Sequence, residues 1–375
     1  MSPDPDPGTE GVGPGAINPY PEAMYPAPLI LLLSMAAILA RAAGGSEHTA
    51  PLFADDSLLE VRIEAPFTTL MRERPDVEYL EGTFAYAGPD GAAPKFDLKL
   101  RTRGNYRRDA EHCDFAPIRL NFRKSQVQGT LLSGQDKLKL VTHCRSRERK
   151  FDRYVLREYL AYRLLNALTP ISYKVRLMRV TYADTEGGPS RTRLGFVIED
   201  EAAVAARNGL NIVSKRWFSW DEQDQRRQNL VHIFQYMIGN TEYSLVNPEP
   251  GKDCCHNAIA LSQTSGPPYI AVPFDFDFSG LVNAPYAQPN PRYPVRKVRT
   301  RHYRGLCINN DLVPQTLQLF LDARDELYRL VEEAHDRVSL SPRSARHYLD
   351  SFYKNIRDPD ALRKSLTGVC YEATG

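Results

Sequence analysis

Several features that mark particular protein classes are missing from this sequence. It has six cysteines but no Cys-X-X-Cys pair, which argues against a zinc cluster. Its 48 Lys and Arg residues nearly balance its 46 Asp and Glu residues, so the net charge gives no case for binding nucleic acid. No internal repeat is found. The apolar run at residues 29–40 is shorter than the roughly 20 residues that a membrane-spanning helix needs.

The first 50 residues differ in composition from the rest of the chain. Residues 2–28 are rich in Pro, Gly and acids and cannot build a core. The apolar run 29–40 and the small residues after it, with Ala40-Arg41-Ala42 as a candidate cleavage site, are typical of a signal peptide. The basic residues that normally precede such a run are absent, so two alternatives stay open: translation could start at Met24, or the run could be an uncleaved anchor.

We therefore expect export to the periplasm, the cell envelope or the extracellular space. Contact with a membrane is expected only through an uncleaved anchor, and no cysteine near the apolar run supports a lipoprotein. In an exported protein six cysteines can form disulfides, although six thiols allow 15 pairings that the sequence does not distinguish. The cysteines are Cys113, Cys144, Cys254, Cys255, Cys307 and Cys370.

The remaining chain has the composition of a folded protein, with 42% hydrophobic and 25% charged residues in a total of 375. Alternating apolar residues predict that residues 55–200 are rich in strands. The expected strands are 58–65, 79–86, 96–103, 116–124, 137–142, 174–183 and 193–199. Apolar residues at helical spacing predict one helix among these strands, at 152–168, and a helical second part, residues 201–375. The expected helices of that part are 221–238, 314–336 and 342–357.

Two acids stand out near the end of the stretch YIAVPFDFDFSG. Asp275 and Asp277 lie two residues apart on a predicted strand, so both carboxylates should leave from one face, about 6.5 to 7 Å apart. The flanking Phe residues should point to the other face. Two like charges on an apolar strand require compensation. A hard divalent cation would supply it, and so would Arg or Lys side chains at the surface.

Other polar residues precede these acids in a suggestive order. Arg103-Gly104-Asn105 is a basic turn that could hold an anion. Lys137 and Lys139 share one face of a predicted strand, and Glu158 lies in the middle of the helix that follows. Gly239-Asn240-Thr241-Glu242 ends a later helix, and His256-Asn257 closes the loop before the acidic strand. Phosphoryl transfer uses a lysine, a helical glutamate, a catalytic carboxylate and metal-holding Asn and Asp residues in this order.

Three stretches carry a resemblance to a known family. RTRGNYRR at 101–108, IGNTEYS at 238–244 and VPFDFDFSG at 272–280 resemble the spore coat protein H (CotH) kinase family and related atypical, secretory-type kinases. The likeness extends over residues 95–290. It implies an α+β, protein-kinase-like two-lobed fold, with a strand-rich N-terminal lobe and a helix-rich C-terminal lobe. It also implies that ATP and Mg or Mn serve to phosphorylate Ser, Thr or Tyr of a protein substrate.

The resemblance places catalytic and metal-binding roles on five residues. Asn240 and Glu242 fall where such kinases keep the catalytic-loop acid, and Asn257 falls where the metal-holding Asn lies. Asp275 or Asp277 matches the metal-binding Asp. These kinases usually have Asp in place of Glu242, and a carboxylate moved by about 1 Å can lower the rate about 100-fold. The 14 residues between Glu242 and Asn257 also form a longer loop than in ordinary protein kinases.

The resemblance places the nucleotide at a second set of residues. Lys139 (or Lys137) with Glu158 would be the ion pair that anchors the nucleotide. Arg103 and Asn105 belong to the turn that would contact its phosphates.

Three other functions compete with this interpretation. A haloacid-dehalogenase-type phosphatase would use the first Asp as nucleophile and the second as acid, but only 95 residues follow Gly280 and they begin with a Pro-rich loop. A DxD glycosyltransferase would require a nucleotide-sugar α/β domain upstream. A catalytically weak or inactive kinase-like binding or envelope protein is the main alternative, because Glu242 departs from the family pattern.

Overall fold

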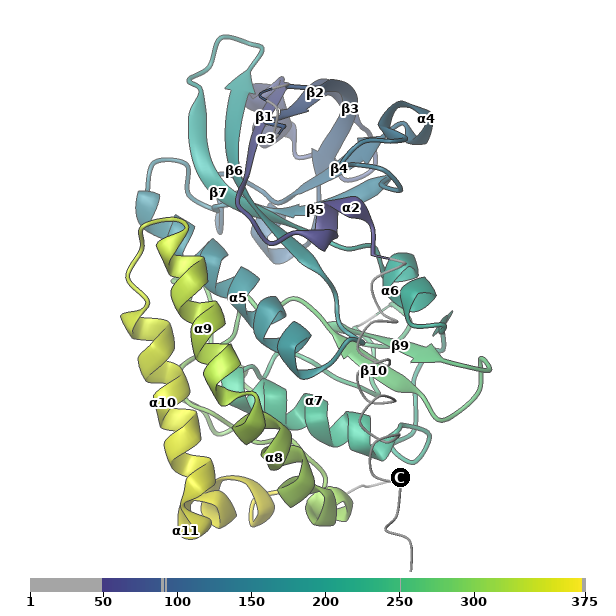
Figure 1. Cartoon of the computed structure of the whole chain (residues 1–375), viewed down its shortest axis with the longest axis vertical. Coiled ribbons are helices and arrows are strands. Elements are labelled where there is room, and N and C mark those ends of the chain that lie inside the picture. The colour runs from purple at the N-terminus through teal and green to yellow at the C-terminus, as the bar shows by residue number, and fades with distance from the viewer. Residues whose placement is uncertain (1–48, 89–90, 92, 250, 373–375) are drawn as a thin grey trace, which may run out of the picture. The chain divides into compact units, whose positions relative to one another are not determined.

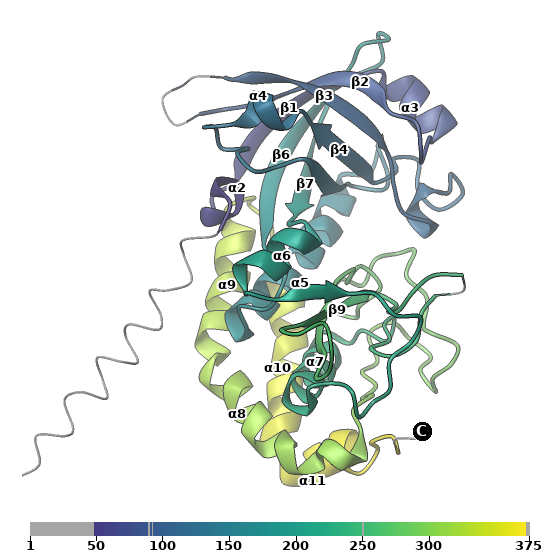
Figure 2. The same cartoon turned by 90° about the vertical axis from the view of Figure 1, so that its right-hand side faces the viewer.

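The computed structural model describes residues 49–88, 91, 93–249 and 251–372 (Figures 1 and 2). The candidate signal peptide therefore lies outside the described residues. From residue 49 on, the described chain forms one compact unit, and the boundary expected between residues 200 and 201 lies within it. Among the helices of this unit, none combines the length and the apolar character that a membrane crossing needs.

Seven strands form a closed barrel in the order β1-β2-β3-β4-β5-β7-β6. The barrel is closed by a parallel pairing of β1 with β6, and its other neighbours are antiparallel. Along β3, Phe96, Leu98 and Leu100 are buried inside, and the residues between them face outward. The interior is therefore a packed apolar core. The strands are β1 Leu59–Ala65, β2 Leu80–Tyr86, β3 Lys95–Thr102, β4 Ile118–Phe122, β5 Lys137–Val141, β6 Val175–Asp184 and β7 Arg191–Ile198.

The predicted protein-kinase-like two-lobed fold is wrong. The seven predicted strands all form, but they close into a mixed barrel with a helical region after it, instead of the sheet and helix of a kinase N-terminal lobe. Closure depends on β1, whose Leu59 pairs with Met178 and whose Ala65 pairs with Asp184. Alternation along a strand shows that one face is buried, but it does not show which distant strand lies beside it.

Helix α5, Asp152–Leu168, has the bounds that the sequence predicts. Figure 1 shows it between the barrel and the helical region, where it packs against β7 and α9. Its Tyr159 and Tyr162 are fully buried in the apolar core that the barrel, α5 and the later helices share. Because α5 is covered on most sides, polar residues on it, including Glu158, are buried as well.

Helix α7, Gln225–Ile238, is the centre of the helical region. The Asp224 side chain caps its start by accepting a hydrogen bond of 2.7 Å from the Arg227 N–H, and Gly239 ends it with φ of 67°. The predicted helix 314–336 is two helices that meet at Ala323. The other helices are α2 Pro51–Ala54, α3 Phe67–Glu73, α4 Lys124–Val127, α6 Glu201–Arg207, α8 Val313–Asp322, α9 Arg324–Asp336, α10 Arg343–Arg357 and α11 Pro359–Leu362.

A small antiparallel sheet lies beside α7 (Figure 2). Its strands are β8 Asn211–Val213, β9 Ala258–Ser262 and β10 Ile270–Pro273, in the order β10-β9-β8. The loop before β9 carries His256 and Asn257, and the turn after β10 carries Asp275 and Asp277. The hairpin of β9 and β10 therefore brings two predicted metal-binding segments to the same end of the sheet.

The cysteines form three disulfides, as expected for an exported protein. The pairs are Cys113–Cys144, Cys254–Cys255 and Cys307–Cys370. Disulfides persist in oxidising compartments and are rare in the cytosol, so the pairing supports an exported location.

Candidate functional site

A group of charged side chains is buried where the barrel meets α5. Arg107 lies in a 3₁₀ turn, Tyr106–Arg108, and its Nη1 is 3.5 Å from Glu158 Oε2 and 3.9 Å from Asp277 Oδ2. The exposed fractions of Arg107, Glu158 and Asp277 are only 8%, 3% and 6%. The guanidinium also lies 5.5 Å from the centre of the Tyr286 ring. We call Arg107, Glu158, Asp275, Asp277 and Tyr286 the buried charge cluster.

Negative charge is in excess in the buried charge cluster. Burial, and then repulsion by Asp275, raises the pKa of Asp277 to about 7, although Arg107 and a hydrogen bond with Tyr286 act in the opposite direction. Burial and Asp277 likewise raise the pKa of Glu158 well above its ordinary value. Three carboxylates thus face two arginines, Arg107 and the nearby Arg103. A divalent cation at Asp275 and Asp277 would remove this imbalance, and carboxylate oxygens are its preferred ligands.

The two acids come together in a different way from the one the sequence suggested. Strand β10 ends at Pro273, and Asp275 has φ of 61°, so both acids lie in a turn after the strand and not on one strand face. Phe276 between them is fully buried, with its ring centre 4.7 Å from that of Tyr162. The Tyr162 hydroxyl accepts a hydrogen bond of 2.9 Å from the Asp275 N–H. The buried Phe276 holds the turn in place.

Asn257 lies against the residue before Asp275. Its carbonyl accepts a hydrogen bond of 2.9 Å from the Phe274 N–H, and its Nδ2 donates one of 2.8 Å to the Glu242 carbonyl. Asn257, like Asp275, has a left-handed backbone, with φ of 53°. Such conformations are uncommon outside glycine and gather at functional sites. The predicted catalytic loop and both predicted metal-binding segments are therefore joined by direct hydrogen bonds.

Asn240 and Glu242 differ in what they can reach. Asn240 is buried, and its Oδ1 accepts a hydrogen bond of 2.9 Å from the Glu242 N–H while its Nδ2 donates one of 3.0 Å to Gln235 Oε1. It therefore positions the loop. The Glu242 side chain is 34% exposed, with Oε1 at 3.4 Å from His256 Nε2 and Oε2 at 3.4 Å from Asn290 Nδ2. Glu242 is accordingly the carboxylate that an incoming hydroxyl could meet.

The predicted ion pair between Lys139 and Glu158 does not form within the described chain. The cation at Glu158 is Arg107, whereas Lys139 Nζ lies 5.2 Å from the centre of the Phe274 ring. Burial, and then the neighbouring Arg103, lowers the pKa of Lys139. Lys137 is exposed on the same face of β5. Arg107 was not predicted as the partner of Glu158. The only signal for it in the sequence is its place just after the Gly104-Asn105 turn.

Three cations stand opposite one another on the outer face of the barrel. Arg101 of β3 pairs in register with Arg119 of β4, which pairs with Lys139 of β5. We call these residues the strand cation row. Like charges directly opposite each other destabilise a sheet, so strand stability does not account for the row. No carboxylate lies within salt-bridge distance of the row in the described residues. An anionic ligand would account for it.

Arg103 links the strand cation row to the acidic turn. It is two residues beyond Arg101, and its N–H donates a hydrogen bond of 2.9 Å to the Pro117 carbonyl. Burial lowers the pKa of Arg103, and attraction to Asp275 opposes that shift. Asn105, the other predicted residue of this turn, is exposed and makes no side-chain cap on the 3₁₀ turn that follows it. Positive charge for phosphates and negative charge for a metal thus lie side by side.

The described residues contain no group of three or more His, Cys, Asp or Glu side chains that could hold a metal by themselves. Mg²⁺ is usually bound through one or two carboxylates together with substrate phosphates. Asp275, Asp277 and Asn257 offer the hard oxygen ligands that such an ion prefers.

Comparison of the chain with protein-family models and with curated proteins found no match. Function is therefore inferred from the arrangement of the side chains.

Proposed function

We propose that the chain is an exported, CotH-like phosphotransferase that uses ATP with Mg or Mn to phosphorylate a Ser, Thr or Tyr hydroxyl of a protein. The observation that carries the proposal is the hydrogen-bonded contact of the Glu242 loop with Asn257, and of Asn257 with the Asp275 turn. The proposal concerns the reaction and not the fold, because one chemistry recurs on unrelated folds.

Each group would have a separate task. Asp275, Asp277 and Asn257 would hold the metal ion, which neutralises charge on the phosphates when bound. The strand cation row and Arg103 would hold the phosphates themselves. Glu242 would orient the acceptor hydroxyl, with His256 and Asn290 fixing its carboxylate. Arg107 and Glu158 would hold Asp277 in position from the buried side.

A phosphatase of the haloacid-dehalogenase type is not supported. Such an enzyme needs a helix directly after its acidic strand. Here the acids are followed by a turn and a long loop, and the next helical element begins at Cys307. A binding protein without transfer activity stays the alternative, because the Glu242 carboxylate is one methylene longer than the usual Asp.

Metal-dependent binding of ATP tests the proposal first. Calorimetry on the wild-type chain should detect ATP only when Mg or Mn is present. Asp275→Asn should weaken this binding by about tenfold or more, because a carboxylate ligand is lost. Asp311→Asn, which changes an exposed acid of the 3₁₀ helix Cys307–Leu312 outside the proposed site, is the matched control. Absence of metal-dependent binding in the wild type would overturn the proposal.

Transfer of labelled γ-phosphate to a protein acceptor separates an enzyme from a binding protein. Glu242→Gln should bind ATP normally and lose transfer by about 100-fold or more. Wild-type binding with no transfer to any protein, including itself, would favour the inactive alternative. If Glu242→Gln transferred phosphate as fast as the wild type, Glu242 would not be the catalytic carboxylate.

A further inference from the structure

A second basic site lies on the side of α5 that faces the C-terminal helices. It is a cavity of about 230 Å³ where the start of α5, the end of α9 and the start of α10 meet, and Figure 1 shows these three elements. We call it the α10 pocket. Its lining is Arg153, Arg157, His335, Leu340, Ser341, Arg343 and Ser344.

The charge of the α10 pocket has one sign. Three arginines and no carboxylate line it, and within the described chain none of the three forms a salt bridge. Burial lowers the pKa of Arg157, and so do its neighbours Arg299 and Arg153; only the Tyr154 hydroxyl opposes them among the named causes. Packing cations together without acids costs free energy, so the folded chain alone offers no reason for this arrangement.

Helix α10 adds its own positive end to the pocket. The helix starts at Arg343 after Pro342 and runs for 15 residues, and no side chain caps its first N–H groups. The start of a helix carries the positive end of the macrodipole and attracts anions. Arg343 at the first helical position therefore opposes the dipole. An anion between Arg343 and the N–H groups would remove this conflict.

Arg157 gives an independent sign of a ligand. Its exposed fraction is 8%, and its Nη1 donates a hydrogen bond of 3.2 Å to the Val282 carbonyl. Although it is this deeply buried, Arg157 forms no salt bridge with a carboxylate of the described residues. Buried charges in folded proteins are normally paired with an opposite charge. An anion in the α10 pocket would supply that partner.

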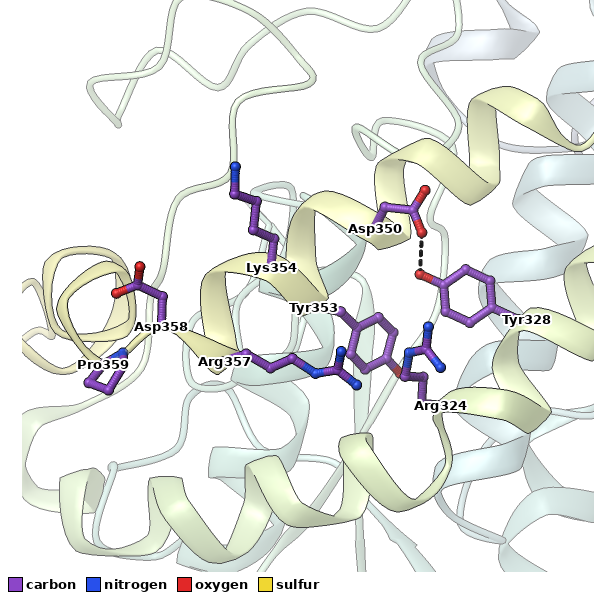
Figure 3. A pocket seen from close by; sticks show the side chains of 8 residues that line it. All are labelled: Arg324, Tyr328, Asp350, Tyr353, Lys354, Arg357, Asp358 and Pro359. Carbon is purple, nitrogen blue, oxygen red and sulfur yellow. Dashed lines mark hydrogen bonds between the residues drawn. The ribbon is translucent and has the colours of Figure 1, made fainter.

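The opposite end of α10 shows what cations do where no anion is needed. Lys354, Arg357 and Arg324 line an open depression of about 700 Å³ there (Figure 3). Asp350 and Asp358 lie among them, and Asp350 accepts a hydrogen bond of 2.6 Å from the Tyr328 hydroxyl. Cations at the end of a helix are favoured by its dipole. Lys354 and Arg357 in the last turn of α10 therefore have a structural explanation, and Arg324, the first residue of α9, has a carboxylate partner in Asp325 at 2.8 Å. The arginines of the α10 pocket have neither.

We propose that the α10 pocket binds a phosphate-type oxyanion, either inorganic phosphate or the phosphoryl group of a phosphorylated residue. Guanidinium groups and helix N–H groups are the donors that recognise such an anion, and hydroxyls of Ser341 and Ser344 would add hydrogen bonds. The site is separate from the Asp275 turn and does not depend on the proposed phosphotransferase activity. Its occupant would lie against Arg157, next to Glu158 on α5.

Binding of inorganic phosphate by the full-length chain tests the site. Thermal unfolding is measured at increasing phosphate concentrations in the presence of EDTA, which removes metal ions. Chloride at the same ionic strength serves as the reference. Wild-type Tm should rise by about 2 °C or more at saturation. In Arg153→Gln/Arg343→Gln, whose two arginines are exposed and need not affect folding, the apparent Kd should rise about tenfold or more. Circular dichroism checks that the variant is folded.

Two controls keep the test specific. Arg357→Gln removes the same charge from the other end of α10 and should bind phosphate as the wild type does. Lys364→Gln removes an exposed cation outside both proposed sites and should also leave the effect intact. No phosphate effect in the wild type, or an effect that survives the double change, would overturn the α10 pocket as the site.

The source of the anion is decided by a second titration. A phosphoserine peptide that binds at least about tenfold more tightly than phosphate, while its unphosphorylated form does not bind, identifies a phosphorylated segment. Equal affinity for peptide and phosphate identifies the free ion. Tight binding of the unphosphorylated peptide would contradict recognition of an oxyanion.

Discussion

The buried charge cluster and the α10 pocket lie on the same helix, yet they handle charge in opposite ways. In the cluster, Glu158 and Asp277 surround one arginine, and carboxylates are in excess. In the pocket, Arg153, Arg157 and Arg343 have no carboxylate beside them in the described chain. An excess of buried carboxylate suits a cation, and an excess of arginine suits an anion. The comparison shows that the sign of the missing charge indicates the class of ligand.

The largest expected difference between the two regions is in stability. Arg107→Met leaves Glu158 and Asp277 buried without their cation, and should lower the free energy of unfolding by about 3–5 kcal/mol. Arg343→Gln removes a cation that has no partner, and should change the same quantity by no more than about 0.5 kcal/mol. Urea unfolding of both variants measures the difference.

A partial recovery would confirm the origin of the loss. Arg107→Met combined with Glu158→Gln should regain part of the lost stability, because one of the stranded carboxylates is replaced by an amide of similar shape. Equal stability of Arg107→Met and the wild type would show that the cluster does not depend on this arginine.

The dependence of stability on pH should differ in sign between the two regions. Burial and Asp275 raise the pKa of Asp277 from 3.8 to about 7 in the folded chain. The folded chain then holds a proton that the unfolded chain releases, so this contribution is complete below about pH 4 and is lost as the pH rises through about 7. Without metal, the slope should reach about 1.4 kcal/mol per pH unit, and Asp277→Asn should flatten it.

His335 should act in the other direction. Burial, and then Arg157, lowers its pKa below the ordinary 6.5. Its contribution to stability is therefore present above about pH 6.5 and is lost as the pH falls. Urea unfolding of Asp277→Asn and of His335→Gln between pH 4 and 8 separates the two slopes. Parallel curves for the wild type and both variants would contradict both assignments.

The smallest expected effect compares the two ends of α10. In buffer without phosphate, Arg343→Gln should stabilise the chain by a few tenths of a kcal/mol, because it removes a cation from the positive end of the helix dipole. Arg357→Gln should destabilise it by a similar amount, because it removes a cation from the negative end. Both effects should shrink in 1 M salt. Thermal unfolding of the two variants at low and high salt would show whether the signs differ.

Much of the secondary structure could be predicted from local patterns. Helix 152–168 was predicted with its observed bounds, and each predicted barrel strand formed within two residues of its expected ends. These segments carry strong periodicity, so their own residues determine their form. The prediction of a single helix at 314–336 was wrong, because two helices form there and nothing in the apolar spacing marks the break at Ala323.

The candidate site could be predicted in part. The contact of Glu242 with Asn257 and of Asn257 with the Asp275 turn agrees with the roles that the sequence suggested, and those roles stay predictions. The Lys139–Glu158 pair was wrong as an ion pair. Arg107, Tyr286 and Asn290 were missed because they lie on segments distant in sequence, in turns and loops that show no periodicity.

The sequence by itself determined which segments are strands and helices, because one buried face leaves a period of two or 3.6 residues in any single element. It also supplied six cysteines, enough for three disulfides, but not their pairing. Only the tertiary structure decided that β1 closes a barrel with β6, that Arg107 and not Lys139 neutralises Glu158, and that three arginines meet at the start of α10. Those outcomes depend on which surfaces of distant segments pack together, and a local pattern carries no record of its distant neighbours.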